Sequence, residues 1–129
     1  MENNKAEVLA TNEAFYRAFE KKDLQAMTLI WSQGTGSSCV HPGSGALQGW
    51  SVVQQSWEAI FANTDYLEID FKVLNLELGD RVAWVLVEET VLQISQRRRL
   101  EAQSLATNVF QKLGPKWYLT HHHGSPIVR

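Results

Sequence analysis

The sequence predicts an α+β fold in which a curved antiparallel sheet wraps around three N-terminal helices and leaves a cone-shaped pocket. Apolar residues recur at helical spacing up to residue 62, and from Tyr66 onward they alternate with polar residues as in strands. A block of helices followed by a block of strands is typical of α+β domains. With 129 residues, 44% of them hydrophobic and 20% charged, the chain suits one domain, residues 1–129, around a single core.

Three helices are predicted in the first half of the chain. Residues 5–21 carry apolar side chains near one face and contain no glycine or proline. Asp23 is a suitable N-cap for a second helix over residues 24–31, and residues 50–62 form a third apolar stripe. Between the last two helices, residues 38–42 are expected to form a short β segment, which a Gly-Ser-Gly loop follows.

The second half predicts four long strands. In the first, which starts at Tyr66, the apolar phase slips after Val73, as it does when a bulge residue is inserted into a bent strand. The second, residues 82–94, opens with VAWVLV, which is apolar on both faces and indicates a central strand. The last two lie within residues 100–127 around a turn signal at 113–116. We expect them to be the longest neighbouring strands and to contact any ligand.

The outer face of the predicted sheet is expected to form a homodimer. Three helices cannot cover both faces of a four-stranded sheet in so short a chain, so the apolar outer face of residues 82–87 requires a partner.

Composition excludes several classes of partner and compartment. A net charge of -2 argues against a nucleic-acid surface, and the basic residues 97–99 are expected at an exposed hairpin tip. The longest apolar run is too short to span a bilayer, and the N-terminus lacks an apolar signal region. We therefore expect no contact with a membrane. Because the single cysteine, Cys39, cannot form an internal disulfide, we also expect a cytoplasmic protein.

The order and spacing of these elements resemble a known family. With KDL at residues 22–24, GW at 49–50 and GPKW at 114–117, nearly the whole chain resembles the SnoaL-like and ketosteroid-isomerase-like branch of the nuclear transport factor 2 superfamily. The closing pattern WxxxHxHxS at residues 117–125 also resembles the calcium/calmodulin-dependent kinase II association domain. The resemblance implies a cystatin-like α+β barrel. Since one such cone hosts many activities, function has to be argued from the pocket residues.

His41 is the first predicted catalytic residue. Ketosteroid-isomerase-like enzymes keep an Asp-Pro in the short strand before the third helix, and the matching dipeptide here is His41-Pro42. A neutral histidine can shuttle a proton as that aspartate does. The alternative is a structural histidine that hydrogen-bonds a neighbouring loop.

Asn108 is the second predicted catalytic residue, as an oxyanion donor. The resemblance implies a tyrosine on the first helix and a protonated acid on the penultimate strand, and these positions fall on Phe15 and Asn108. Phenylalanine cannot donate a hydrogen bond, and the neighbouring Tyr16 is rotated toward a different face. A buried asparagine that serves only its neighbours is the alternative for Asn108.

The remaining pocket residues are predicted to be mostly apolar or aromatic. Trp84, Leu86 and Glu88 form one alternating set on the strand of residues 82–94. If this set faces inward, Glu88 becomes a second candidate acid or base, and the alternative is a solvated glutamate at the end of the sheet. The predicted ligand-contacting residues are Phe15, Tyr16, Trp31, Trp57, Trp84, Leu86, Glu88, Phe110 and His123.

The three consecutive histidines do not predict a metal site. His121 and His123 share one face about 7 Å apart at strand spacing, but no third ligand is fixed by the sequence. A structural or dimer-face role is favoured for them, with ligand contact as the alternative, and His122 is expected on the opposite face.

Two functions remain open from the sequence. The first is a cofactor-independent isomerase, lyase or cyclase that acts on a small, largely apolar or organic-acid molecule, with His41 as proton shuttle and Asn108 as oxyanion donor. The second is a non-catalytic ligand-binding or oligomerisation module.

Overall fold

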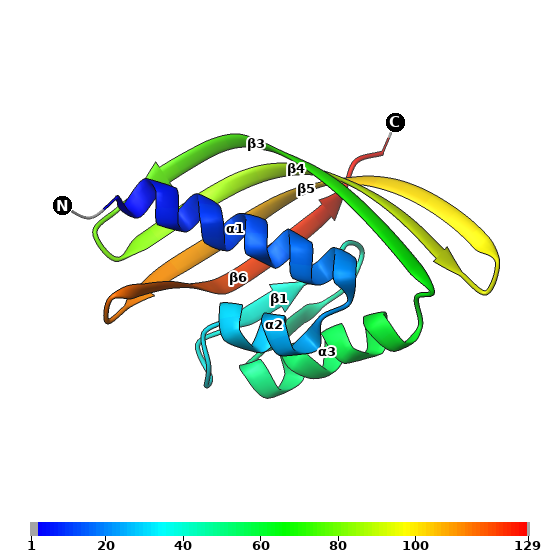
Figure 1. Cartoon of the computed structure of the whole chain (residues 1–129), viewed down its shortest axis with the longest axis horizontal. Helices are drawn as coiled ribbons and strands as arrows, with labels where there is room; N and C mark the ends of the chain where they lie inside the picture. The colour runs from blue at the N-terminus through cyan, green and yellow to red at the C-terminus, as the bar shows by residue number, and fades with distance from the viewer. Residues whose placement is uncertain (1–2, 129) are drawn as a thin grey trace.

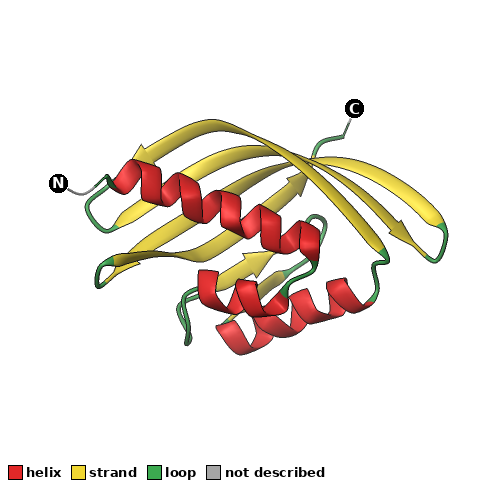
Figure 2. Cartoon of the chain, viewed as in Figure 1, coloured by secondary structure: helices red, strands yellow, loops and turns green. Residues whose placement is uncertain are grey.

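The computed structural model describes residues 3–128, which form three helices and one six-stranded sheet (Figures 1 and 2). In chain order the elements are α1 (Asn4–Lys21), α2 (Leu24–Ile30), β1 (Ser38–Val40), β2 (Ala46–Gln48), α3 (Trp50–Ala62), β3 (Tyr66–Leu78), β4 (Val82–Ser95), β5 (Arg98–Leu113) and β6 (Lys116–Pro126). All three helices lie on one side of the curved sheet, with α1 running along the long strands (Figure 2). The predicted α+β cone is confirmed.

The sheet has the strand order β2-β1-β6-β5-β4-β3. All pairs are antiparallel except β1 with β6, which run parallel. The prediction of four strands and a purely antiparallel sheet was therefore incomplete, because β1 pairs with β6 and the three residues of β2 form a small hairpin with β1. The last two strands were predicted to be the longest, but β6 has only 11 residues, whereas β3 and β4 have 13 and 14.

The predicted helix boundaries agree with the structure to within one residue. The Asn3 side chain accepts a hydrogen bond from the Ala6 amide at 3.1 Å, and the Asp23 side chain accepts one from Ala26 at 3.0 Å. Each bond satisfies an amide that the first turn of a helix leaves unpaired. Lys22 takes a left-handed conformation with φ 54°, which ends α1 and lets α2 begin immediately.

Two bulges bend the sheet and decide which side chains face the helices. In β3 the register shifts between Val73 and Asn75, as the slip of the apolar pattern predicted. A second shift lies in β6, where Val109 pairs with His121 but Phe110 pairs with Leu119, so that Thr120 is the additional residue. Because side chains alternate along a strand, one additional residue reverses the facing of everything beyond it.

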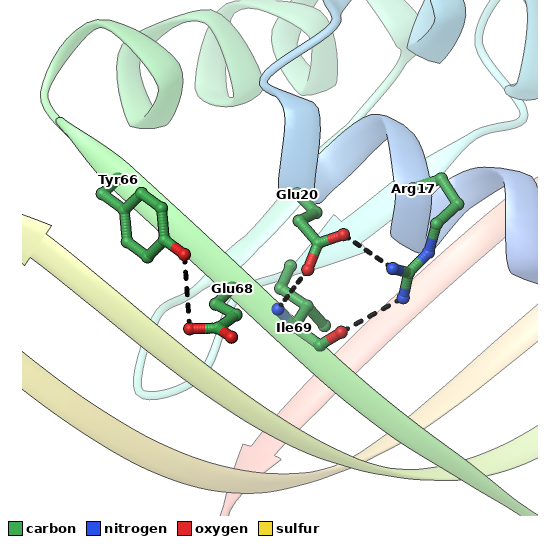
Figure 3. A network of polar contacts seen from close by, with 5 residues as sticks. All are labelled: Arg17, Glu20, Tyr66, Glu68 and Ile69. Atoms are coloured by element: carbon green, nitrogen blue, oxygen red, sulfur yellow. Dashed lines mark hydrogen bonds and ion pairs between the residues drawn. The ribbon is translucent and has the colours of Figure 1, made fainter.

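Side chains of α1 bind the exposed edge of β3 (Figure 3). The Glu20 carboxylate accepts a hydrogen bond from the Ile69 amide at 2.7 Å, and the Arg17 guanidinium donates to the Ile69 carbonyl at 3.1 Å. Arg17 and Glu20 also form an ion pair at 2.6 Å. These contacts satisfy backbone groups that an edge strand leaves unpaired, and they fix α1 over the sheet.

The core lies between the helices and the inner face of the sheet. Large apolar and aromatic side chains fill it, among them Val8, Phe15, Met27, Trp31, Val53, Trp57, Ile69, Val85, Phe110 and Leu119. None of the helices in residues 3–128 combines the length and the hydrophobicity that crossing a membrane requires.

The outer face of β4 and β5 carries apolar side chains that no helix covers. Val82, Trp84 and Leu105 are all exposed, and Trp84 retains 38% of its accessible surface. The turn between β4 and β5 is also exposed, and its two residues, Gln96 and Arg97, both have positive φ. This is the type of two-residue turn that suits a twisted hairpin.

Candidate functional site

A cavity of about 580 Å³ opens between α3 and the far half of the β4–β5 hairpin. Its wall is mainly apolar, with Phe19, Ile60, Val91, Leu100 and Ala102 among the lining side chains. The titratable groups in the lining are Glu89, His41 and His122. None of the described lining residues is a lysine or an arginine. The site is therefore an apolar chamber with one carboxyl and two imidazoles.

The pairing of β4 with β5 determines the order of the lining residues along the cavity. Inward-facing pairs run from Glu89 with Ser104, through Val91 with Ala102 and Gln93 with Leu100, to Ser95 with Arg98. All of these residues except Arg98 line the cavity. Six residues separate Glu89 from Ser95, which corresponds to about 20 Å at strand spacing. The lining of this hairpin thus extends from the buried Glu89 to the half-buried Ser95 beside the turn, at the rim of the cavity.

Glu89 is the carboxyl of the cavity. It is only 3% exposed, and it accepts a hydrogen bond from the Tyr16 hydroxyl at 2.6 Å. Burial raises the pKa of Glu89 to about 7, although the bond from Tyr16 opposes the shift. The same burial and the nearby Glu89 raise the pKa of Tyr16, so this phenol stays protonated and donates. Near neutral pH Glu89 therefore exists in both its acid and its carboxylate form.

A chain of hydrogen bonds connects Glu89 with His122 beneath the cavity wall. The Asn108 amide donates to the Tyr16 hydroxyl at 3.1 Å and to the Asn12 carbonyl oxygen at 2.9 Å. The Asn108 carbonyl oxygen lies 2.6 Å from His122 Nδ1. A carbonyl oxygen can only accept, so Nδ1 of His122 carries the hydrogen.

The unprotonated nitrogen of His122 is consequently Nε2, which keeps its lone pair as an acceptor. Burial, followed by repulsion from the other histidines, lowers the pKa of His122 to about 3. This imidazole stays neutral under all mild conditions. Because it lines the cavity with a defined tautomer, it can accept a hydrogen bond from a ligand hydroxyl.

His41 has the opposite tautomer. Its Nε2 lies 3.0 Å from the Ser56 hydroxyl, which is itself 2.6 Å from the Val53 carbonyl. The single hydroxyl hydrogen of Ser56 is needed for that short contact, so His41 Nε2 donates and Nδ1 keeps its lone pair. Burial lowers the pKa of His41, and its ring packs edge-on against Trp57 at 4.8 Å. His41 is therefore a neutral base on the cavity wall.

Cys39 lies beside His41 but is not an activated thiol. Its sulfur is 3.8 and 3.9 Å from the two ring nitrogens of His41. Burial raises the pKa of the Cys39 thiol to about 12, and the nearby Glu89 adds to the shift. The thiolate that nucleophilic catalysis needs is thus disfavoured.

Asn108 cannot act as the predicted oxyanion donor in this arrangement. It is fully buried and does not line the cavity, and both of its amide hydrogens are engaged by Tyr16 and Asn12. Its place is one layer below the cavity, where it holds His122 and Tyr16. Of the alternatives left by the sequence, the asparagine that serves its neighbours is the one the geometry supports.

The predicted aromatic wall also lies one layer below the cavity. Phe15, Trp31, Trp57 and Phe110 are fully buried and do not line it. Phe15 packs against Trp57 at 5.6 Å and against the His122 ring at 5.0 Å. These residues support the lining side chains, as Tyr16 supports Glu89. Phe19, one helical turn beyond Phe15, is the α1 aromatic that reaches the cavity.

Four predicted ligand contacts lie on the outer face of the sheet, which corrects their assignment. Trp84, Leu86 and Glu88 alternate with the inward-facing set that contains Glu89. His123 is exposed, and it is His122 that faces inward. The first error arose because β4 is apolar on both faces, and the second because the bulge at Thr120 reverses the facing of the histidines.

No group of three or more His, Cys, Asp or Glu side chains suited to a metal ion occurs among residues 3–128. His121 is engaged with Ser38 at 2.6 Å, and its ring lies 6.1 Å from that of His123 on the outer face.

Known proteins resemble this chain over most of its length. Residues 8–129 match the SnoaL-like domain family. A protein from Streptomyces avermitilis, assigned as a dehydratase of the NTF2-like family, is 28% identical with a TM-score of 0.88 over 96% of both chains. A protein from Thiobacillus denitrificans, assigned as a calcium/calmodulin-dependent protein kinase type II association domain, is 27% identical with a TM-score of 0.83 over 92% of this chain and 94% of its own.

One curated relative is F-box protein SKIP8 from Arabidopsis thaliana, which is 25% identical over 121 residues. That match covers 94% of this chain, and the chain spans about half the length of the relative. The family match extends from Val8, in the second turn of α1, through the last strand and so contains every residue of the cavity. The chain belongs to the SnoaL-like domain family.

Proposed function

We propose that the protein is a cofactor-independent isomerase or lyase that binds a small, largely apolar organic molecule in the cavity and moves a proton within it. The observation that carries this proposal is the meeting of one carboxyl, Glu89, and two imidazoles, His41 and His122, in a single apolar cavity of about 580 Å³. General acid–base catalysis requires such groups within reach of one bound molecule.

The order in which these groups take up protons supports the proposal. In water a glutamate is a stronger acid than an imidazolium, so a Glu–His pair exists as two ions near pH 6. Here the pKa of Glu89 is raised to about 7, while the pKa of both His41 and His122 is lowered. A neutral acid and a neutral base therefore coexist in the cavity, which is the state that a proton shuttle needs.

The three groups have different roles in this proposal. His41 removes a proton from a carbon next to a carbonyl group, because burial lowers its pKa and keeps it neutral while its Nδ1 retains a lone pair. Glu89, in its acid form, donates a hydrogen bond or a proton to the oxygen that gains charge or leaves. His122 Nε2 accepts a hydrogen bond from a ligand hydroxyl and orients it. Asn108 and Tyr16 are positioning residues.

The alternative is a non-catalytic ligand-binding module. Its support is that the hydroxyl of Tyr16 and the amide of Asn108 both bind other protein groups, so neither is available to stabilise a ligand oxyanion. The similarity to half of an F-box protein is compatible with a module of this kind. In either case we expect a cytoplasmic homodimer that packs through the outer face of the sheet.

Deuterium exchange tests catalysis without knowledge of the natural substrate. β-Tetralone, an apolar ketone, is incubated with the protein in deuterium oxide, and loss of its α-proton signals is followed by NMR. We expect exchange above background, reduced by about 10²–10⁴-fold in His41→Gln. Glu89→Gln should also reduce exchange, whereas Glu88→Gln, one residue away on the outer face, should not. Binding of the ketone without exchange above background would favour the ligand-binding module.

A further inference from the structure

We propose that the ligand is an elongated molecule with an uncharged hydroxyl or carbonyl head beside Glu89 and an anionic tail beside Arg98, about 20 Å away at strand spacing. This inference rests on the proposed use of the cavity for a small organic ligand. It adds the length of that ligand, the position of its charge and a residue that selects it.

The end of the cavity beside the buried Glu89 suits an uncharged group. Its only carboxyl is Glu89, and none of the described lining residues carries a positive side chain that could balance a ligand carboxylate. Both imidazoles are neutral there. An anion placed at this end would lose its hydration without gaining a counter-ion, which is costly in an apolar site. A hydroxyl group instead finds a donor in Glu89 and an acceptor in His122, and a carbonyl oxygen finds a donor in Glu89.

The middle of the cavity is apolar, and its rim is polar. Beyond Glu89 the walls are Val91 with Ala102, then Leu100 beside the amide of Gln93, and finally the hydroxyl of Ser95. A chain of methylene groups or a flat ring system matches the middle section. The order from Glu89 to Ser95 is thus polar, apolar and polar, which suits a ligand with two different ends.

Arg98 is the cation at the rim. It pairs directly with Ser95, which lines the cavity, so the two residues share the inner face of the sheet. Arg98 is exposed and forms no ion pair with any described residue. The turn before it is held by a hydrogen bond from the Gln96 amide to the Asp65 carboxylate at 3.0 Å. The backbone of Arg98 therefore lies beside the lining residue Ser95, at the end of the cavity next to the turn.

The neighbouring Arg99 provides a matched control. It belongs to the same basic cluster and is equally exposed, but alternation places it on the outer face, opposite Ile94. A general attraction of anions to the cluster would involve both arginines equally. Recognition of a ligand tail that emerges from the cavity involves Arg98 alone.

The test measures binding of ω-hydroxy fatty acids, from octanoate to octadecanoate, and of the corresponding diols without the carboxylate. Affinity is followed at low salt by calorimetry. We expect it to rise with chain length up to a span of about 20 Å. The long acids should bind about two- to fivefold more tightly than the diols, as an exposed ion pair allows. Arg98→Gln should abolish this preference and Arg99→Gln should preserve it, and high salt should suppress it in the wild type.

Three results would overturn the inference: equal affinity for acids and diols, equal losses in Arg98→Gln and Arg99→Gln, or a preference for the shortest acids. Both variants are at an exposed tip, and their melting temperatures verify that they fold. The exchange of β-tetralone separates this inference from the proposed function, because the ketone has no anionic tail. If the acids and diols bind equally but exchange continues in both the wild type and Arg98→Gln, the inference about the tail fails and the proposed catalysis stands. If the acids are preferred but no exchange occurs, catalysis fails and the inference about the tail stands.

Discussion

The raised pKa of Glu89 makes the stability of the fold depend on pH in a defined direction. The folded pKa is about 7 and the unfolded reference is 4.5, so between these values the folded state holds a proton that the unfolded state has lost. Stability contributed by this residue is full below about pH 4.5 and is lost as the pH rises through about 7. Glu89→Gln imitates the protonated acid at every pH and should remove this loss.

The magnitude follows from the size of the shift. A rise from 4.5 to about 7, at about 1.4 kcal/mol per unit, corresponds to a penalty of about 3 kcal/mol for the ionised form. Little solvent screening is expected, because Glu89 is only 3% exposed. Urea denaturation of both proteins across this pH range should give nearly equal free energies of unfolding at the acidic end. Above about pH 7 Glu89→Gln should be more stable by up to about 3 kcal/mol.

The neighbouring Glu88 is the control. Its side chain lies on the outer face of β4, so Glu88→Gln should give a difference from the wild type that changes little with pH. If the difference between Glu89→Gln and the wild type is also constant with pH, Glu89 is not held in its acid form by burial. The argument for a neutral acid in the cavity would then be refuted.

The other predictions concern His122, Asn108 and the outer face. Because the pKa of His122 is lowered in the folded state, acidification from about pH 6.5 toward about 3 should lower the free energy of unfolding. Urea denaturation should show a smaller loss in His122→Gln, and an equal dependence of the free energy on pH in both proteins would contradict this. Asn108→Leu leaves partners in Asn12 and His122 unpaired and should cost at least about 2 kcal/mol in unfolding experiments, and a smaller loss would show that this network is not held by Asn108. Trp84→Arg should convert a dimer into monomers in sedimentation at micromolar concentration, while a wild type that is already monomeric would refute the sheet-face dimer.

The helices and the main strands could be predicted because their apolar patterns are unambiguous. The bulge in β3 was also predictable, since the apolar phase of the sequence shifts visibly at Leu74. The strand β2 was missed because its three residues carry no pattern of their own and depend on pairing with β1. Local sequence thus accounts for the elements that bury a full face, and tertiary pairing decides the short ones.

The cavity residues were harder to predict because their identity depends on strand facing. Glu88 and Glu89 are adjacent, and the apolar residues on both faces of β4 give no sign of which glutamate points inward. In β6 the pattern of Trp117 and Leu119 correctly marks the inner face, but the bulge at Thr120 transfers that face to His122. No apolar slip marks this bulge, because the residues after it are histidines. The assignments of Glu88 and His123 are therefore each wrong by one position along a strand.

Ligand binding should change the number of protons bound in the cavity, because the pKa of Glu89 is near neutrality. An uncharged apolar ligand displaces water from around Glu89 and disfavours its carboxylate further, so the pKa of Glu89 should rise above about 7 in the complex. At about pH 7 the protein should take up a fraction of a proton as β-tetralone binds. His41 is already neutral there, so it contributes little. Calorimetry in two buffers with different ionisation enthalpies measures the uptake, which should vanish in Glu89→Gln and persist in Glu88→Gln. Proton release on binding would mean that the ligand stabilises the carboxylate, and the acid role of Glu89 would have to be abandoned.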